Sequence, residues 1–240
     1  MKTLYNLLTR PIINILSNLF VRINQKTFLF KEKFPSGVIN NLNRIAMEES
    51  TSYFKKFESE IMLFHRREDL WDYTLNYIPD SGLILEFGVW YGRSINYMAK
   101  KLKNRNFVGF DSFEGLQEDW FGTWMPKNFF DQKGKLPKVP KNVKLIKGWF
   151  NKTLPNFLNE NKDQFAIIHI DCDTYYSTKE IFELIGKQIK KGSIIIFDEY
   201  HGNPGWKEGE FKAFKEFVTK NKIKYKYIGI TNKQCSVLIY

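Results

Sequence analysis

The sequence predicts an α/β fold in which helices cover both faces of a doubly wound, mostly parallel β-sheet. Three observations support this prediction. Short apolar runs alternate with helix-like segments over residues 82–221, several of these runs are apolar without a break, and 43% of the residues are hydrophobic. Continuously apolar strands are typical of parallel sheets that are covered on both faces. The 240 residues are enough for one such domain with a sizeable core.

Five segments are expected to form the parallel strands. Their sequences are GLILEFGV, NFVGFDSF, VKLIKGWF, FAIIHIDCD and GSIIIFDEY, at residues 82–89, 106–113, 143–150, 165–173 and 192–200. The crossover helices are expected at residues 93–103, 152–162, 178–191 and 207–221, the third of which ends at Gly192. A helical pattern over residues 43–77 precedes them, and strands at residues 224–231 and 235–240 are expected to close the fold as an antiparallel hairpin.

Residues 1–42 are expected to form an amphipathic helix and a polar connector before a single catalytic domain at residues 43–240. The helix carries apolar residues at helical spacing: Leu4, Leu8, Ile12, Ile15, Leu19 and Ile23. A soluble monomer would have to cover this stripe, so we expect it in the subunit interface of a homo-oligomer or on a membrane surface. Polar residues interrupt any membrane-spanning run and no small-residue cleavage site follows, so neither a span nor a signal peptide is expected.

The composition limits the classes of function. The formal net charge of +11 comes from lysines spread over much of the sequence. It would steer an anionic partner, although a generally lysine-rich proteome gives the same balance. The chain has neither a compact basic helix nor an RNA-recognition signature, so no nucleic-acid partner is expected. Its two cysteines, Cys172 and Cys235, lack the spacing of a zinc or redox site and fit a reducing cytoplasm.

Ligands of a doubly wound sheet bind at the carboxyl ends of its strands. There, the segment ILEFGVWYGRSI places Glu86, Gly88 and Gly92 in a strand-to-helix turn that lacks the glycine spacing of a dinucleotide site. Asp111 ends the next expected strand, where a carboxylate can accept hydrogen bonds from two ribose hydroxyls, and Ser112 follows it. Dinucleotides and S-adenosylmethionine both carry such a ribose. Because acidic Glu86 would repel a pyrophosphate and suits a sulfonium cation, the sequence favours S-adenosylmethionine.

Two alternatives stay open at this turn. The glycines can serve only the packing of a helix against a strand, a role that the pairing with Asp111 makes less favoured. Trp149 and Phe150 follow the third expected strand and can flank an adenine by stacking, although aromatic residues at such a position are nearly as often part of the core. We include both among the candidate cofactor contacts.

Acidic residues follow two further strands. Asp171 and Asp198 lie at adjacent strand ends, and Glu199 is next in sequence. Converging carboxylates repel one another unless protons or a hard cation neutralise them, and oxygen ligands favour magnesium or calcium over zinc. These three residues are therefore candidate magnesium ligands, with a salt-bridged cluster facing lysine or arginine as the alternative. Asp173 has no assured role and can orient Asp171 or a water molecule.

The segments LEFGVWYGRSI, FVGFDSFEGL, KGWFNKTLP, IIHIDCDTYYST and FDEYHGNPGWKEGEFKAF resemble, in order, the motifs of the macrocin O-methyltransferase family. The similarity covers about residues 60–217. It implies a Rossmann-like class I methyltransferase fold and a metal-dependent activity on sugar hydroxyls of antibiotics and related glycans. By this resemblance, Glu86, Gly88 and Asp111 contact S-adenosylmethionine, and Asp171, Asp198 and Glu199 bind magnesium. Family members commonly carry a second aspartate where this chain has Glu199.

An O-methyltransferase has to weaken the O–H bond of its acceptor while it aligns oxygen, methyl carbon and sulfur. We expect Asp171 to act as the base, because a cation ligand with a second free oxygen lies within reach of the bound hydroxyl. His201 is the rival base. His169 falls in an expected buried strand and is predicted to be a core histidine.

The segment at residues 112–142 is too long for an ordinary connection and too aromatic for a plain solvated loop. We interpret it as a lid over the substrate. Its aromatic residues can stack on a sugar ring or a lipid-like aglycone, or form a small satellite core or dimer contact: Trp120, Phe121, Trp124, Phe129 and Phe130.

The leading hypothesis is thus a magnesium-dependent S-adenosylmethionine O-methyltransferase that acts on a sugar, glycan or glycosylated small molecule. A nucleotide-binding oxidoreductase of Rossmann type and a non-catalytic protein with the same fold remain the alternatives.

Overall fold

A computed structural model describes residues 37–162 and 164–240. The chain divides into two compact units, Met1–Arg44 and Ile45–Tyr240. Of the first unit only residues 37–44 are described, and they include the start of helix α2 (Val38–Phe54). The amphipathic helix expected near the N-terminus lies outside the described residues. In the part of the chain that the structure describes, no helix is long and apolar enough to cross a membrane.

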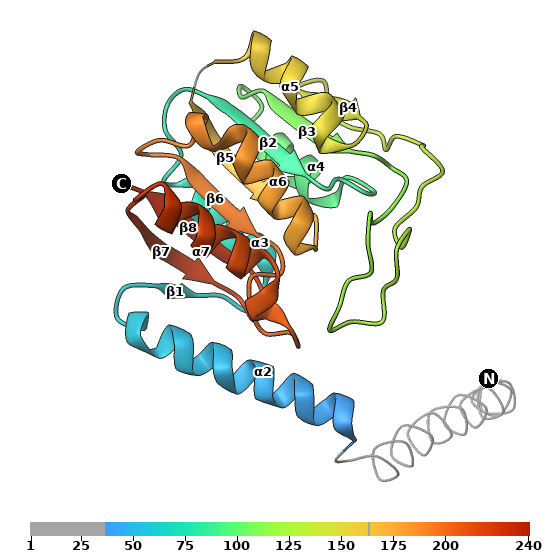
Figure 1. Cartoon of the computed structure of the whole chain (residues 1–240). Coiled ribbons are helices and arrows are strands. Elements are labelled where there is room, and N and C mark those ends of the chain that lie inside the picture. Colours follow the sequence, from blue (N-terminus) through green and yellow to red (C-terminus); the bar gives the residue numbers. More distant parts are fainter. Residues whose placement is uncertain (1–36, 163) are drawn as a thin grey trace, which may run out of the picture. The chain divides into compact units, whose positions relative to one another are not determined.

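The second unit is built on an eight-stranded sheet, which confirms the predicted fold class (Figure 1). The strand order is β1-β7-β8-β6-β5-β2-β3-β4. Strands β6, β5, β2, β3 and β4 run parallel, whereas β8 is antiparallel to both β6 and β7, as predicted for the final hairpin. The strands are β1 (Met62–Leu63), β2 (Leu83–Phe87), β3 (Phe107–Asp111), β4 (Val143–Lys147), β5 (Phe165–Ile170), β6 (Ile194–Phe197), β7 (Tyr225–Ile230) and β8 (Cys235–Ile239).

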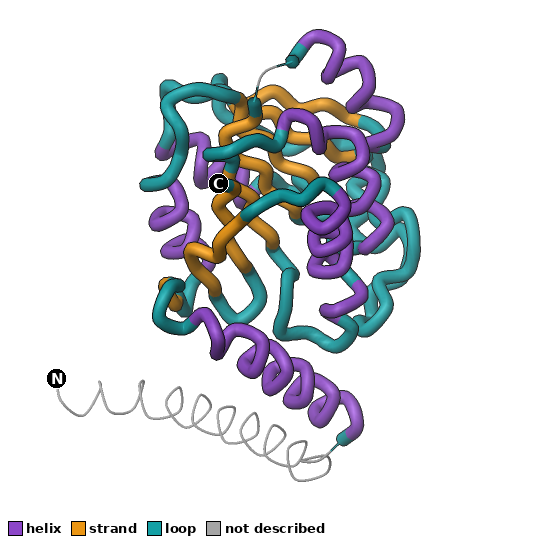
Figure 2. Tube along the Cα trace, turned by 60° about the vertical axis from the view of Figure 1, so that its left-hand side comes forward, coloured by secondary structure: helices purple, strands orange, loops and turns teal. Residues whose placement is uncertain are grey.

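Helices cover the two faces of this sheet, as Figure 2 shows. Side chains alternate along β2, so that Leu85 and Phe87 join one hydrophobic core and Ile84 joins another. The first core also contains side chains of α5 (Phe150–Glu160), α6 (Tyr175–Ile185) and α7 (Glu210–Lys220). The second contains side chains of α3 (Arg67–Leu75) and α4 (Arg93–Lys101). Residues that follow each other at a strand end therefore face opposite layers.

The continuous helical pattern expected over residues 43–77 was wrong. The structure breaks it after α2 into a 3₁₀ turn (Lys55–Phe57), strand β1 and helix α3. Strand β1 has two residues, which is too short to show the alternation by which strands are recognised in a sequence. It forms because its backbone pairs in parallel with β7.

Candidate active site

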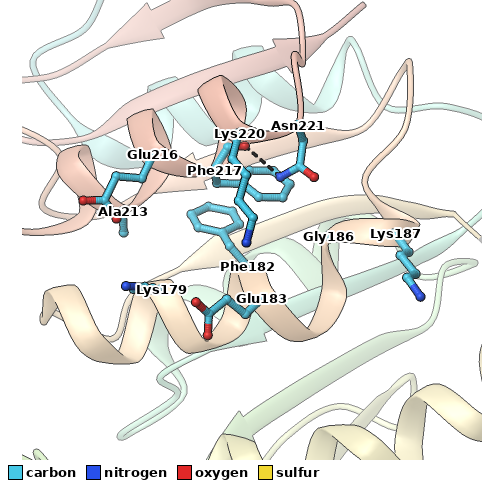
Figure 3. Close-up of a pocket in the computed structure, with 10 residues that line it drawn as sticks. All are labelled: Lys179, Phe182, Glu183, Gly186, Lys187, Ala213, Glu216, Phe217, Lys220 and Asn221. Carbon is cyan, nitrogen blue, oxygen red and sulfur yellow. Dashed lines mark hydrogen bonds between the residues drawn. The ribbon is translucent and has the colours of Figure 1, made fainter.

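A cavity of about 420 Å³ lies at the carboxyl ends of β2, β3, β5 and β6. It is lined by most of the residues that the sequence singled out: Gly88, Asp111, Ser112, Trp149, Phe150, Asp171, Asp198 and Glu199. A second cavity of about 460 Å³ lies between α6 and α7 and is lined by lysine, glutamate and phenylalanine side chains (Figure 3). None of the predicted site residues lines it. The first cavity is therefore the candidate active site.

The turn after β2 is tightly built against the end of β5. Gly88 has φ +88°, and a Cβ atom there would lie 1.7 Å from the backbone oxygen of Asp171. Only glycine fits such an approach. Gly92 has φ +74° and precedes the first residue of α4, but it does not line the cavity. Its role in the structure is to start the helix.

Asp111, the last residue of β3, holds this turn in place. Its Oδ2 atom accepts hydrogen bonds from the backbone N–H groups of Val89 (2.7 Å) and Trp90 (2.8 Å). Its Oδ1 atom accepts one from the N–H of Phe113 (2.6 Å). Trp90 and Phe113 both have positive φ values, 47° and 56°, which non-glycine residues adopt at a cost in free energy. One carboxylate thus stabilises two strained turns at the cavity wall.

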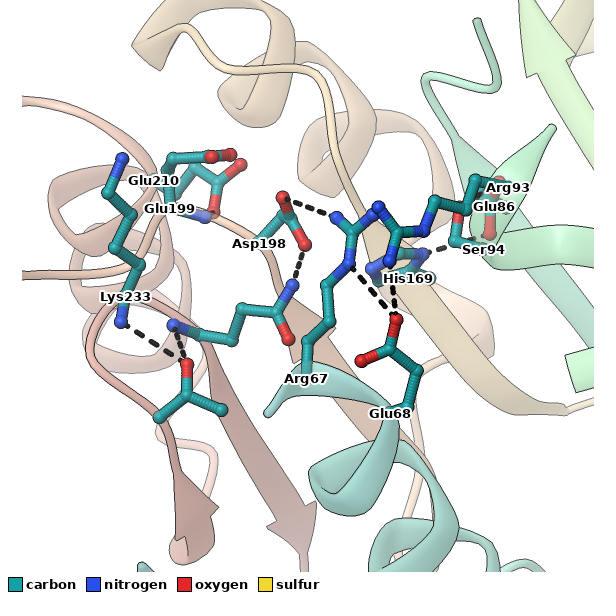
Figure 4. A network of polar contacts seen from close by, with 12 residues as sticks. Arg67, Glu68, Glu86, Arg93, Ser94, His169, Asp198, Glu199, Glu210 and Lys233 are labelled. Carbon is teal, nitrogen blue, oxygen red and sulfur yellow. Dashed lines mark hydrogen bonds and ion pairs between the residues drawn. The ribbon is translucent and has the colours of Figure 1, made fainter. Parts of the chain in front are cut away.

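Glu86 lies beneath the cavity and does not line it. The register of β2 and β5 places it opposite His169, and both side chains are buried. Its Oε1 atom accepts a hydrogen bond from Ser94 Oγ (2.9 Å), and its Oε2 atom lies 2.9 Å from His169 Nδ1 (Figure 4). The predicted burial of His169 is confirmed. The contact of Glu86 with a cofactor stays a prediction.

The acids at the ends of β5 and β6 form two groups that share Asp171. Ligand atoms of His169, Asp171 and Asp198 lie within 4.8 Å of one another, and so do those of Asp171, Asp173 and Glu199. The expected set of Asp171, Asp198 and Glu199 is divided between them. The reason is alternation: Asp198 and Glu199 are consecutive, so their side chains point to opposite faces of the sheet.

The salt-bridge alternative has one contact in its favour. Arg67 Nη1 lies 3.9 Å from Asp198 Oδ2, and the side-chain amide of Gln234 donates a hydrogen bond to Asp198 Oδ1 (Figure 4). Arg67 itself also lies near Glu68, which forms a 2.7 Å ion pair with Arg93. Asp198 therefore has polar neighbours of its own before any ligand binds.

Burial raises the pKa of several of these carboxyls. The pKa of Asp171 lies well above its ordinary value because of burial, and the charges of Asp198, Glu199 and Asp173 raise it further. Burial, followed by the charges of Asp198 and Asp173, has the same effect on the pKa of Glu199. One carboxylate oxygen of Glu199, Oε2, is buried without a hydrogen-bond partner. The cluster therefore tends to bind protons or a cation.

Sequence reasoning missed one member of this cluster, Glu210, the first residue of α7. Its side chain is buried, its Oε2 atom accepts a hydrogen bond from the N–H of Glu199 (3.3 Å), and its Oε1 atom is buried without a partner. A signal was present, because Glu210 lies on the apolar stripe of α7 with Ala213, Phe214 and Phe217. An acid on such a stripe indicates a buried carboxyl.

The raised pKa values predict how the stability of the cation-free protein depends on pH. Burial raises the pKa of Glu210, so the folded state holds this proton more tightly than the unfolded state. Stability from this group is present below its ordinary pKa and is lost as pH rises toward the folded value. Between about pH 5 and pH 8, Glu210→Gln should therefore lose less unfolding free energy than the wild type in urea denaturation with chelator.

Glu183, which is exposed on α6, supplies the control for this experiment. Glu183→Gln should follow the pH dependence of the wild type. If Glu210→Gln also follows it, the Glu210 carboxyl titrates alike in the folded and unfolded states, and the expectation is wrong.

His201, the rival base, lies apart from the cavity. It is buried, its ring lies 4.7 Å from that of Phe54, and neither of its ring nitrogens has a hydrogen-bond partner. Burial lowers the pKa of His201 to about 4. It is not among the residues that line the cavity, so the structure does not bring it together with Asp171.

The segment at residues 112–142 contains neither a helix nor a strand and forms one wall of the cavity, through residues that include Trp120, Met125 and Phe130. Phe121 and Trp124 are 81% and 75% exposed. Between them, Gly122 approaches the backbone of Pro204 so closely that a Cβ atom would lie 2.1 Å from its oxygen. The expected lid thus borders the cavity and presents exposed aromatic rings.

Comparison with known sequences gives a consistent picture. Residues 85–200 match a family described as a methyltransferase domain. A relative from Streptomyces olivaceus, 8-demethyl-8-(2,3-dimethoxy-alpha-L-rhamnosyl)-tetracenomycin-C 4'-O-methyltransferase, is 29% identical over 142 residues, which are 50% of this chain and 53% of the relative. The chain thus spans about half the length of the curated relative that it matches.

Solved structures share the fold. CalS11, a calicheamicin methyltransferase, aligns with a TM-score of 0.57 at 24% identity, over 83% of this chain and 89% of CalS11. The O-methyltransferase NovP aligns with a TM-score of 0.55 at 22% identity, over 71% of this chain and 79% of NovP. Together with the strand order and the cavity at the strand ends, the family match identifies residues 85–200 as a methyltransferase domain.

Proposed function

We propose that the protein is a magnesium-dependent O-methyltransferase, related to the macrocin O-methyltransferase family, that transfers a methyl group from S-adenosylmethionine to a hydroxyl of a sugar, glycan or glycosylated small molecule. The observation that supports it most is the cavity in which the turn at Gly88, the Asp111 carboxylate and the acids of β5 and β6 meet. The name of the Streptomyces relative, a rhamnosyl 4'-O-methyltransferase, supports a sugar as the acceptor.

The residues of the cavity fit S-adenosylmethionine. The close backbone approach at Gly88 leaves the strand end open to an amino-acid group, and Asp111 still has unused lone pairs for ribose hydroxyls beside its three backbone contacts. Trp149 and Phe150 line the same cavity and can hold an adenine between them and the turn. Acidic surroundings favour a sulfonium over a pyrophosphate.

The donor set also fits magnesium. Asp171, Asp173 and Glu199 offer oxygen atoms within 4.8 Å of one another, and the free Oε2 atom of Glu199 is the kind of buried acceptor that a cation satisfies. When bound, Mg²⁺ supplies positive charge that lowers the pKa of a hydroxyl. Asp198 lies at the edge of this group, beside Arg67.

Asp171 is the residue that we assign as the base. It lines the cavity, and its raised pKa brings its proton affinity closer to that of a group that works near neutral pH. The proton of the acceptor hydroxyl would move to a carboxylate oxygen of Asp171 as the oxygen attacks the methyl carbon. The lid segment, with Trp120 and Phe130 in the wall, would exclude water from this transfer.

Asp111→Ala should weaken the binding of S-adenosylhomocysteine by about 1.5–3 kcal/mol, the range for a hydrogen bond to a charged group. The loss combines the ribose contact with the support that Asp111 gives to the N–H groups of Val89 and Trp90. Isothermal titration calorimetry measures it. Asp119→Ala, a change within the lid outside the cavity lining, is the control. An unchanged affinity in folded Asp111→Ala would show that this carboxylate does not bind the ribose.

Calorimetry with S-adenosylmethionine, S-adenosylhomocysteine and NAD tests the function as a whole. We expect the first two to bind and NAD not to bind. Methyl transfer from labelled S-adenosylmethionine to a panel of rhamnosyl and other glycosides, with and without magnesium, then tests the reaction. Binding of NAD alone would favour the oxidoreductase, and binding of none of the three would favour a non-catalytic protein.

A further inference from the structure

His169 is a buried histidine with one nitrogen in use and one free. It is fully buried in β5, its Nδ1 atom lies 2.9 Å from Glu86 Oε2, and its Nε2 atom has no hydrogen-bond partner. In a neutral imidazole whose Nδ1–H is donated to a carboxylate, Nε2 carries a lone pair. A buried acceptor without a donor costs free energy, so this lone pair calls for a ligand.

Two carboxylates lie next to this histidine. A ring nitrogen of His169 and one oxygen each of Asp171 and Asp198 lie within 4.8 Å of one another, and Nε2 is the ring nitrogen that the Glu86 contact leaves free. A carboxylate that accepts the opposite N–H of a histidine is the usual device by which proteins orient a metal-binding imidazole. Glu86, His169, Asp171 and Asp198 reproduce that arrangement, from β2, β5 and the end of β6.

We propose that His169, Asp171 and Asp198 bind a first-row transition-metal ion, such as Mn²⁺ or Co²⁺. Magnesium prefers oxygen ligands, whereas imidazole nitrogen favours transition metals. This position shares Asp171 with the oxygen-only group of Asp171, Asp173 and Glu199, so it extends the cation chemistry of the proposed function. Metal binding can be measured without methyl transfer, and the two proposals therefore fail separately.

The competing cation at this position is the guanidinium of Arg67. Its Nη1 atom lies 3.9 Å from Asp198 Oδ2, beyond hydrogen-bond distance. The hydrogen bond from Gln234 is made to the other oxygen, Oδ1. The Oδ2 atom of Asp198 therefore keeps lone pairs for a metal ion, and Arg67 lowers the net charge of the group without closing it.

A titration of cofactor-free protein with Co²⁺, followed by the visible absorption of the bound ion, tests the proposal. His169→Gln should weaken Co²⁺ binding by about 10-fold or more and change the spectrum. His201→Gln removes the other buried histidine, which belongs to neither acidic group, and should leave Co²⁺ affinity unchanged within about twofold. Equal affinity in His169→Gln and the wild type would overturn the proposal.

A second measurement does not depend on the folding of a variant. Wild-type protein labelled with ¹⁵N-histidine and loaded with Mn²⁺ should show a ¹⁵N coupling in pulsed electron paramagnetic resonance, because the imidazole is a direct ligand. Mn²⁺ that binds without such a coupling is held by the oxygen ligands alone, and that result would also overturn the proposal. Calorimetry with S-adenosylmethionine on the same samples reports separately on the proposed function.

Discussion

Gly88→Ala is expected to destabilise the protein by about 3–5 kcal/mol and to abolish S-adenosylmethionine binding. The added methyl group would lie 1.7 Å from the backbone oxygen of Asp171, and the φ of +88° is unfavourable for alanine. Neither strain can relax locally, because the N–H of Gly88 is bonded to the oxygen of Phe110 and the N–H of Asp171 to that of Phe87. Thermal unfolding, with a midpoint lowered by roughly 10 °C or more, measures the effect.

Gly209→Ala is the matched control for this prediction. Gly209 has φ −98°, and its new Cβ atom would meet no atom closer than the Trp206 oxygen at 3.8 Å. This variant should unfold within about 1 kcal/mol of the wild type and bind the cofactor normally. A Gly88→Ala protein that is as stable as the Gly209→Ala protein would mean that the ends of β2 and β5 do not approach as described.

Asp171→Asn should reduce methyl transfer by about 1,000-fold or more, the largest loss of activity that we expect from a conservative change. The substitution removes the assigned base and also a charged oxygen ligand that belongs to both acidic groups. Excess magnesium should not restore activity, since the proton would still lack an acceptor. Cofactor affinity should stay near that of the wild type, because Asp111 and the Gly88 turn belong to other strand ends.

Asp173→Asn gives the comparison, because Asp173 belongs to only one of the two acidic groups. It should raise the magnesium concentration needed for half-maximal activity and leave the rate at saturating magnesium within about tenfold of the wild type. Steady-state rates over a magnesium series separate the two variants. Asp171→Asn with activity within tenfold of the wild type would remove Asp171 from the role of base.

The sheet could be predicted because its inner strands carry a strong signal. The segments at β2, β5 and β6 are apolar without interruption, since both of their faces are covered. The same physics explains what was missed. Strand β1 is held by backbone pairing with β7, and backbone hydrogen bonds leave no trace in the residue types of two positions.

The candidate site was predictable where strand ends carry it, as at Asp111 and Asp171. Its pairings were not, because they depend on register. The partnership of Glu86 with His169 follows from the alignment of β2 with β5, and a shift by one residue would turn His169 to the other face. Arg67 and Gln234 come to Asp198 from α3 and from the turn before β8, elements for which the sequence holds no site motif.

The position of β8 has a consequence for the synthesis of the protein. Strands β1 and β7 join the rest of the sheet only through β8, which is the last strand along the described chain. On the ribosome, the five parallel strands can assemble while residues 235–239 are still in the exit tunnel, but the sheet edge at β6 then stays open. Until β8 inserts, the nascent chain exposes an unpaired apolar edge, so trigger-type chaperones that cover such edges should associate with it late in translation.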